Sequence, residues 1–131
     1  MIVDASVAVK WLIDEPGSDA ADRLLVGGGL GSPDLIFAEV ANTLWKAWRR
    51  GDFAELPGGI ATLADCFQHV MPCATLMMPA ARLAVELDHP AYDCFYLAMA
   101  IAEDVPLVTA DRRFLAACAR TAHAARVRAL T

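Results

Sequence analysis

Short apolar segments alternate along the chain with longer stretches whose apolar residues recur at helical spacing. The clearest periodicity is Ile36, Val40, Leu44 and Trp48, which predicts one long helix over residues 36–50. Similar patterns predict further helices over residues 5–13, 18–26, 59–69, 80–88, 91–102 and 112–119. Short apolar runs predict strands at residues 1–3, 73–76, 106–109 and 126–130, with another strand just before residue 36.

This order of elements indicates an α/β fold. Strands separated by helices favour a parallel sheet that is covered on both faces. We therefore expect a three-layer α/β/α arrangement with four to five parallel strands, formed by residues 1–131 as a single domain. In such sheets the functional crevice lies beyond the carboxyl ends of the strands.

The composition favours a folded domain without a membrane span. Of 131 residues, 57% are hydrophobic and 21% are charged, which provides enough apolar surface to offset the entropy of ordering. The longest apolar run, residues 94–102, is too short to cross a membrane, and no signal-peptide pattern opens the chain. The four cysteines contain no CxxC pair and the three histidines no metal-binding spacing. We therefore expect buried cysteines, no structural zinc and a cytoplasmic location.

The net charge of −5 argues against a protein that grips nucleic acid through a uniformly basic surface. A local basic patch is still possible, because five arginines fall within the last twenty residues: Arg112, Arg113, Arg120, Arg126 and Arg128. Several acids lie near predicted helix ends or loops, where we expect water to solvate them, among them Asp14, Glu15, Asp22 and Glu55.

Four of the sixteen acids stand between apolar neighbours, where an unpaired carboxylate is costly to bury. Asp4 and Asp111 each follow a predicted strand, so both could simply be helix N-caps. Glu39 lies in the long helix and could be a solvated acid on its polar face. Asp93 lies in the first turn of an apolar helix, where the helix dipole favours an acid.

The expected positions of these four acids point to a metal site. Strand ends and helix starts at one sheet edge would bring the carboxylates together, and without a cation they would repel one another. Mg²⁺ and Mn²⁺ prefer oxygen ligands, so either ion would resolve this repulsion. Such a site suits phosphodiester hydrolysis, because the metal polarises a phosphoryl oxygen and activates a water while a nearby carboxylate orients or deprotonates it.

The chain resembles PIN-domain ribonucleases, in particular the VapC toxins of bacterial VapBC toxin–antitoxin modules. The resemblance covers the whole chain and rests on four segments in the family's order: Ile2–Ser6, Ala38–Asn42, Tyr92–Asp93 and Thr109–Asp111. It implies an acidic quartet that holds Mg²⁺ or Mn²⁺ and carries catalysis: Asp4, Glu39, Asp93 and Asp111. It also implies accessory roles for three polar side chains: Ser6, Thr109 and Asn42.

The same resemblance implies an endoribonuclease that cleaves tRNA or rRNA and leaves 5′-phosphate and 3′-hydroxyl ends. It further implies a homodimer and a cognate VapB-like antitoxin that binds beside the active site and silences it. Four basic side chains are candidate RNA contacts, although each could be solvated or ion-paired instead: Arg112, Arg113, Lys10 and Lys46. Trp11 and Trp48 lie on apolar helical stripes and are expected in the core or at a dimer contact.

Other functions of small α/β domains fit the sequence less well. A haloacid-dehalogenase-like phosphatase requires a second acid two residues after the first, where this chain has Ser6. A receiver domain requires a late lysine, whereas the last lysine here is Lys46. A catalytically silent PIN-like module that binds protein or RNA stays open as the alternative. Loss of a quartet acid would favour that module, and all four acids are present.

Overall fold

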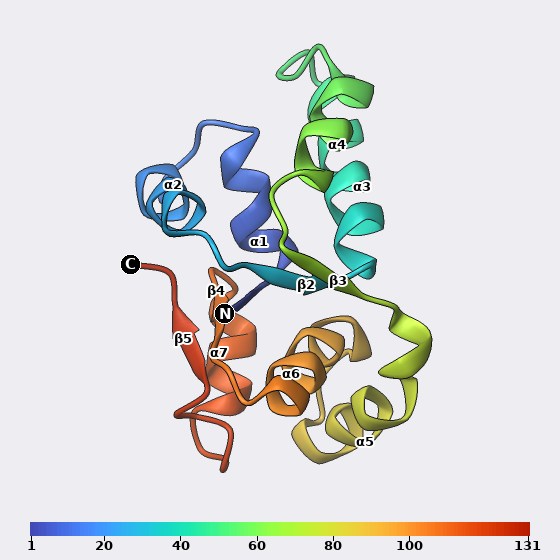
Figure 1. The fold of residues 1–131 in the computed structure, drawn as a ribbon, viewed down its shortest axis with the longest axis vertical. Coiled ribbons are helices and arrows are strands. Elements are labelled where there is room, and N and C mark those ends of the chain that lie inside the picture. The colour runs from blue at the N-terminus through green and yellow to red at the C-terminus, as the bar shows by residue number, and fades with distance from the viewer.

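The computed structural model describes residues 1–131 and contains one five-stranded sheet with the order β3-β2-β1-β4-β5 (Figure 1). All neighbouring strands are parallel. The strands are short: β1 (Ile2–Val3), β2 (Gly31–Pro33), β3 (His69–Met71), β4 (Leu107–Thr109) and β5 (Val127–Ala129). The predicted parallel sheet of four to five strands is therefore confirmed.

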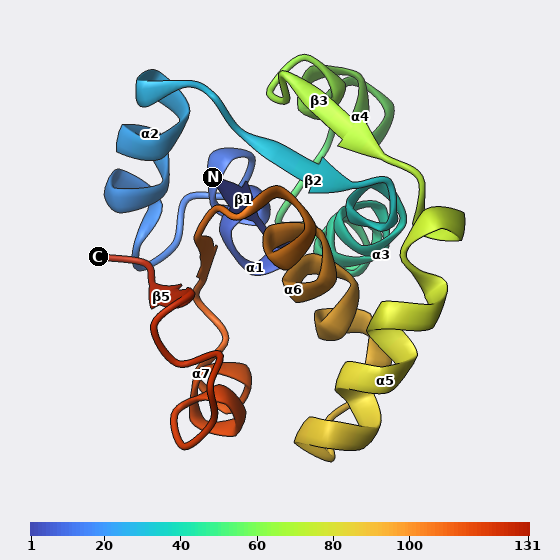
Figure 2. The same cartoon turned by 60° about the horizontal axis from the view of Figure 1, so that its bottom comes forward.

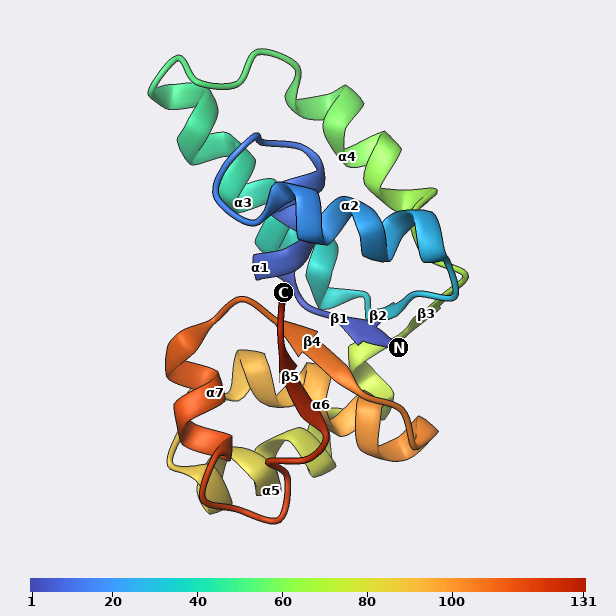
Figure 3. The ribbon, with the colours of Figure 1, turned by 90° about the vertical axis from the view of Figure 1, so that its left-hand side faces the viewer.

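Seven helices form the two outer layers of the molecule. They are, in chain order, α1 (Ala5–Ala8), α2 (Ser18–Gly27), α3 (Leu35–Arg49), α4 (Leu56–Ala64), α5 (Met77–Leu87), α6 (Ala91–Glu103) and α7 (Arg112–Cys118). Two 3₁₀ turns, η1 (Val9–Trp11) and η2 (Cys73–Thr75), follow α1 and β3. Helices α1 to α4 cover one face of the sheet and α5 to α7 the other, as Figure 3 shows. The predicted three-layer arrangement is thus confirmed.

Two elements predicted between residues 59 and 76 are wrong in position. The helix expected over 59–69 is α4, which begins at Leu56 and ends at Ala64. The strand expected at 73–76 lies instead at His69–Met71, and residues 73–75 form η2. Pro57 in the first turn favours the earlier helix start. The apolar signal of β3 is short and weak, since only Val70 and Met71 carry it, and its pairing with β2 defines the strand.

The two residues of β1 point to opposite faces of the sheet and join separate parts of the core. Ile2 packs in a cluster of 21 buried residues and Val3 in a smaller cluster of five. Helix α6 lies between α5 and α7 (Figure 2) and is buried from Tyr96 to Ala100, in agreement with its nearly continuous apolar sequence. None of the helices has the length and apolar character needed to span a membrane.

The predicted burial of the cysteines and tryptophans is confirmed only in part. All four cysteines are free. Cys94 and Cys118 are buried, whereas Cys66 and Cys73 are half-buried. Trp11 packs against the core, and its indole N–H donates to the carbonyl of Ala21 over 2.9 Å. Trp48 is 53% exposed, so it does not belong to the core. The rest of its apolar stripe, Ile36, Val40 and Leu44, is fully buried, and Trp48 lies in the last turn of α3.

The chain turns at the carboxyl edge of the sheet next to the predicted acids. Asp4 follows β1 and begins α1, while Asp111 follows β4 and begins α7. Helix α3 begins at Leu35, two residues after the end of β2. Because parallel strands end at the same edge, these three turns place their side chains on one side of the molecule.

Packing of α5 against α6 should control the stability of the layer that carries Asp93. Leu83 is 6% exposed and belongs to the larger core cluster, whereas Val85 on the same helix is 85% exposed. We expect Leu83→Ala to lower the free energy of unfolding by about 2–4 kcal/mol, because it leaves a cavity. The control Val85→Ala should change it by no more than about 0.5 kcal/mol. Urea denaturation measures both variants, and equal losses would contradict this packing.

Candidate active site

A cleft of about 680 Å³ opens at the carboxyl edge of the sheet and is lined by all four predicted acids. Asp4 comes from the end of β1, Glu39 from α3, Asp93 from α6 and Asp111 from the start of α7. Three other predicted site residues also line the cleft: Ser6, Asn42 and Lys10. The fold therefore brings together side chains from four segments that are far apart in the sequence.

Asp4 is both a helix cap and a buried acid in the cleft. Its Oδ1 accepts from the backbone N–H of Val7 over 3.3 Å and from the Ser6 hydroxyl over 2.5 Å, and its Oδ2 accepts from the Thr109 hydroxyl over 2.5 Å. The side chain is almost fully buried. Burial raises the pKa of Asp4 to about 6, although the hydrogen bonds from Ser6 and Thr109 oppose this shift.

The hydroxyls of Ser6 and Thr109 fasten the ends of β1 and β4 to each other. They lie 3.3 Å apart. The Ser6 oxygen accepts from the backbone N–H of Ala110 over 2.8 Å, and the Thr109 oxygen accepts from that of Asp111 over 3.0 Å. Ser6 lines the cleft, while Thr109 is fully buried beneath it. Both hydroxyls thus hold Asp4 and the chain next to Asp111 in fixed positions.

Asp93 lies in the first turn of α6 and is held by a histidine that the sequence interpretation did not single out. Its Oδ2 lies 2.6 Å from Nε2 of His89, whose ring centre lies 5.0 Å from that of Phe114 at an interplanar angle of 41°. Burial raises the pKa of Asp93; the bond to His89 lowers it, and the charge of Asp111 raises it further. The four-residue spacing of His89 and Asp93 across Pro90 is the sequence signal that could have revealed this pair.

Glu39 is half-buried and does not face water as a solvated helix acid would. The Tyr96 hydroxyl donates to its Oε1 over 2.5 Å. Burial raises the pKa of Glu39, and the charge of Asp93 raises it further. Burial and the charge of Glu39 raise the pKa of Tyr96 strongly, so the phenol stays protonated and acts as a donor. Tyr96 also lines the cleft, and its position three residues after Asp93 on α6 was the signal that could have revealed it.

Asp111 caps α7, as its position after a strand predicted. Its Oδ1 accepts from the backbone N–H groups of Arg113 and Phe114 over 2.9 and 3.2 Å. Its other oxygen, Oδ2, has no partner in the protein. The cap therefore fixes the side chain at the cleft while one oxygen stays available.

The ligand atoms that the cleft offers are carboxylate oxygens, the type of ligand that suits a hard divalent cation. Glu39 Oε2, Asp93 Oδ1 and Asp111 Oδ2 each lack a protein partner, whereas both oxygens of Asp4 are engaged. Carboxylates that raise one another's pKa are relieved by a cation, and oxygen is the ligand that Mg²⁺ and Mn²⁺ prefer. The side chains do not form a ready-made ligand group, since no three His, Cys, Asp or Glu lie close enough together to hold an ion as they stand.

Of the four predicted RNA contacts, one lines the cleft and three do not. Lys10 lines it. Arg112 and Arg113 follow Asp111 directly, are exposed and form no ion pair. Lys46 is exposed on α3 and lies outside the cleft lining.

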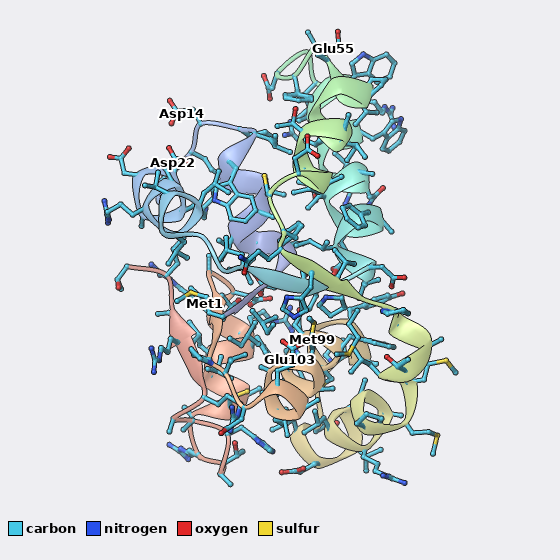
Figure 4. The ribbon with its side chains drawn as sticks, in the orientation of Figure 1. Met1, Asp14, Asp22, Glu55, Met99 and Glu103 are labelled. Carbon is cyan, nitrogen blue, oxygen red and sulfur yellow. The ribbon has the colours of Figure 1, made fainter.

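The acids expected to be solvated lie mostly at the periphery. Asp14, Asp22 and Glu55 are exposed and project from the outer parts of the molecule, as Figure 4 shows. Glu15 is the exception, because it lines the cleft and pairs with Lys10 over 2.9 Å. Glu15 is therefore only partly solvated, and the expectation that it is simply a solvated acid needs this correction.

The raised pKa of Asp4 should make the metal-free protein less stable as the pH rises. Between the ordinary pKa of 3.8 and the folded value of about 6, the folded state keeps a proton that the unfolded state loses, so stability falls through this window. At pH 7.5 in EDTA, we expect Asp4→Asn to raise the free energy of unfolding by about 2–3 kcal/mol and the melting temperature by about 5 °C or more.

Thermal denaturation followed by circular dichroism at pH 3.5 and pH 7.5 checks this expectation. The gain of Asp4→Asn should largely disappear at the lower pH, because the wild-type carboxyl is then mostly protonated in both states. Asp14→Asn, which removes an exposed acid, is the control and should change little at either pH. A variant that melts earlier than the wild type at pH 7.5 would show that the charge of Asp4 does not burden the fold.

The model of the PIN domain matches residues 1–120. The chain is 32% identical over 118 residues to Ribonuclease VapC3 of Pyrobaculum aerophilum, a match that covers 86% of this chain and 90% of that protein. The crystal structure of PAE2754 from Pyrobaculum aerophilum has a similar fold, with a TM-score of 0.65, 25% identity and coverage of 88% of this chain and 77% of that one. The chain belongs to the PIN-domain family.

Proposed function

We propose that this chain is a VapC-like toxin that cleaves RNA, tRNA or rRNA, in a reaction that depends on Mg²⁺ or Mn²⁺. The observation that carries the proposal is the convergence of four carboxylates from separate segments in one cleft, where burial and mutual charge raise the pKa of three of them. The similarity to a protein named Ribonuclease VapC3 supports the choice of RNA as substrate.

The proposed ligand set for the metal is the acidic quartet: Asp4, Glu39, Asp93 and Asp111. The bound ion would polarise the phosphoryl oxygen and offset the charge that develops during hydrolysis. In this reaction a water oxygen bonds to phosphorus and the bond from phosphorus to O3′ breaks, which leaves a 5′-phosphate and a 3′-hydroxyl.

The protein's own side chains orient this chemistry. Ser6 and Thr109 hold Asp4, His89 holds Asp93, and Tyr96 holds Glu39 through the hydrogen bonds described above. A carboxylate oxygen that is not engaged in these bonds would orient the attacking water and accept its proton. Asn42 lines the cleft without a protein partner and would offer its amide to that water or to the substrate.

RNA would reach the acidic cleft along the exposed arginines next to it. Arg112 and Arg113 carry no ion pair and begin α7 beside Asp111, so both are free to contact phosphates. Their charges would compensate locally for the net charge of −5.

The proposed partners are a cognate VapB-like antitoxin and a second copy of the chain in a homodimer. An acidic cleft of this kind favours an antitoxin that places a basic side chain among the carboxylates, because the interaction would resemble a charge-assisted hydrogen bond. Four free cysteines fit a reducing cytoplasm.

The competing proposal is a PIN-like module that binds protein or RNA without catalysis. One observation favours it: no three acids lie close enough together to hold an ion as they stand. Metal binding separates the two proposals without knowledge of the RNA target.

Calorimetric titration of Mn²⁺ into the partner-free protein tests the metal site. We expect saturable binding by the wild type and its loss in Asp4→Asn/Asp93→Asn, because that change removes two of the proposed ligands. Asp14→Asn/Asp22→Asn removes the same charge from exposed positions and should bind Mn²⁺ like the wild type. Absence of binding by well-folded wild-type protein would favour the silent module.

Growth arrest on expression in a bacterial host tests the activity itself. We expect Asp93→Asn to abolish arrest, with at least about a 100-fold loss of RNA cleavage, since a metal-binding carboxylate acts directly on the reaction. The exposed-acid variant Asp14→Asn should arrest growth as the wild type does. Arrest that persists undiminished in Asp93→Asn would point to a binding platform.

A further inference from the structure

Lys10 is the sole basic side chain that lines the cleft. The other charged side chains of the lining are five acids: Asp4, Glu15, Glu39, Asp93 and Asp111. Lys10 lies in η1, and its side chain is only 12% exposed. A cation in this position is unusual, because lysine side chains commonly extend their charged end into water.

The ammonium group of Lys10 is held by two acceptors from the loop that follows η1. Nζ donates to Oε1 of Glu15 and to the backbone carbonyl of Pro16, each over 2.9 Å. An ammonium group has three N–H donors. The third donor of Lys10 has no acceptor in the protein, and the side chain borders the cleft.

The loop over residues 15–18 is shaped around this lysine. The Ser18 hydroxyl accepts from the backbone N–H of Glu15 over 3.0 Å and donates to the carbonyl of Ile13 over 3.2 Å, which fixes Glu15. Gly17 has φ +95, and a Cβ at this position would lie 3.3 Å from Cε of Lys10. Only glycine therefore combines this backbone conformation with such close approach to the lysine stem.

Stability alone does not account for this arrangement. An ion pair with a partly exposed carboxylate contributes little to stability, because solvent screens it and the lysine loses rotamer freedom. Glu15 is 38% exposed at its side chain, so the pair is of this kind. A fixed cation beside five carboxylates does have a use when a polyanion enters the cleft, since it offsets repulsion at one point.

We propose that Lys10 contacts a phosphate oxygen of the RNA strand in the cleft, and that Glu15 and the Pro16 carbonyl position its ammonium group for this contact. The inference rests on the proposed function and extends it to a residue for substrate binding. Lys10 supplies the free N–H as donor, while Glu15 acts through Lys10 and touches no substrate.

Binding of a fluorescein-labelled RNA of randomised sequence, about 12 nucleotides long, tests the contact by fluorescence anisotropy in Mn²⁺. RNA integrity is checked on a gel. We expect Lys10→Met to weaken binding about 5- to 20-fold and to lower the slope of log affinity against log salt by about 0.7, the value for one phosphate contact with a single strand. Lys10→Arg should retain most of the affinity, and the control Arg82→Met, exposed on α5 outside the cleft lining, all of it.

Two further measurements separate substrate contact from a structural role. Mn²⁺ binding should not weaken in Lys10→Met, because Lys10 is not a metal ligand and its loss makes the cleft more negative. Glu15→Gln should weaken RNA binding in the wild-type background, because Glu15 positions the lysine. It should not weaken binding in Lys10→Met, where the loss of one acid can only favour the RNA. A different result would overturn the proposal: Lys10→Met melts at a lower temperature than the wild type, and Lys10→Arg does not restore RNA binding. The Lys10–Glu15 ion pair would then serve only to stabilise the loop.

The outcomes for the two proposals differ. If the wild type and Lys10→Met bind RNA with the same affinity and the same salt dependence, the role of Lys10 is overturned and the proposed function still stands. Wild-type protein that binds neither RNA nor Mn²⁺ overturns both.

Discussion

The side chain of Asp4 joins the end of β1, the start of α1 and the end of β4 through hydrogen bonds with Val7, Ser6 and Thr109. Burial makes the charge of this carboxylate costly, and the hydroxyl donors offset part of that cost. The geometry of the sheet edge therefore depends on one acid that is unfavourable for the fold. A residue of this kind is expected where function opposes stability.

The other half-buried acids of the cleft follow the same physical pattern. His89 holds one oxygen of Asp93, Tyr96 holds one oxygen of Glu39, and each carboxylate keeps its second oxygen without a protein partner. A donor that fixes one oxygen orients the other, so the free oxygens point from defined positions and lose little entropy when they bind a ligand. Both donors come from α6 or from the turn just before it, and α6 lies between α5 and α7 (Figure 2). The packing of these helices therefore determines the geometry of the site.

Local patterns were sufficient for the sheet class, the helices of the core and the four acids, because each leaves a short-range signal. Asp4 and Asp111 stand at strand ends, and Glu39 and Asp93 stand between apolar neighbours within their helices. The position of β3 could not be predicted correctly, because pairing with β2 defines this strand and its residues are mostly exposed. The hydrogen bond between Tyr96 and Glu39 could not be predicted for a related reason, because it joins residues 57 positions apart. Likewise, Glu15 faces the cleft only because its loop folds back onto Lys10.

The charge balance of the cleft links activity to inhibition in the proposed function. Five carboxylates and one ammonium group leave a strong excess of negative charge, so a phosphate enters only with compensating cations. The metal and Lys10 would supply these inside the cleft, and Arg112 and Arg113 would supply them outside it. A basic side chain from a partner would satisfy the same carboxylates and thereby displace both the metal and the substrate. In the proposed function, the excess of acid that would bind a metal for catalysis would therefore also make the site open to inhibition by a basic side chain of the partner.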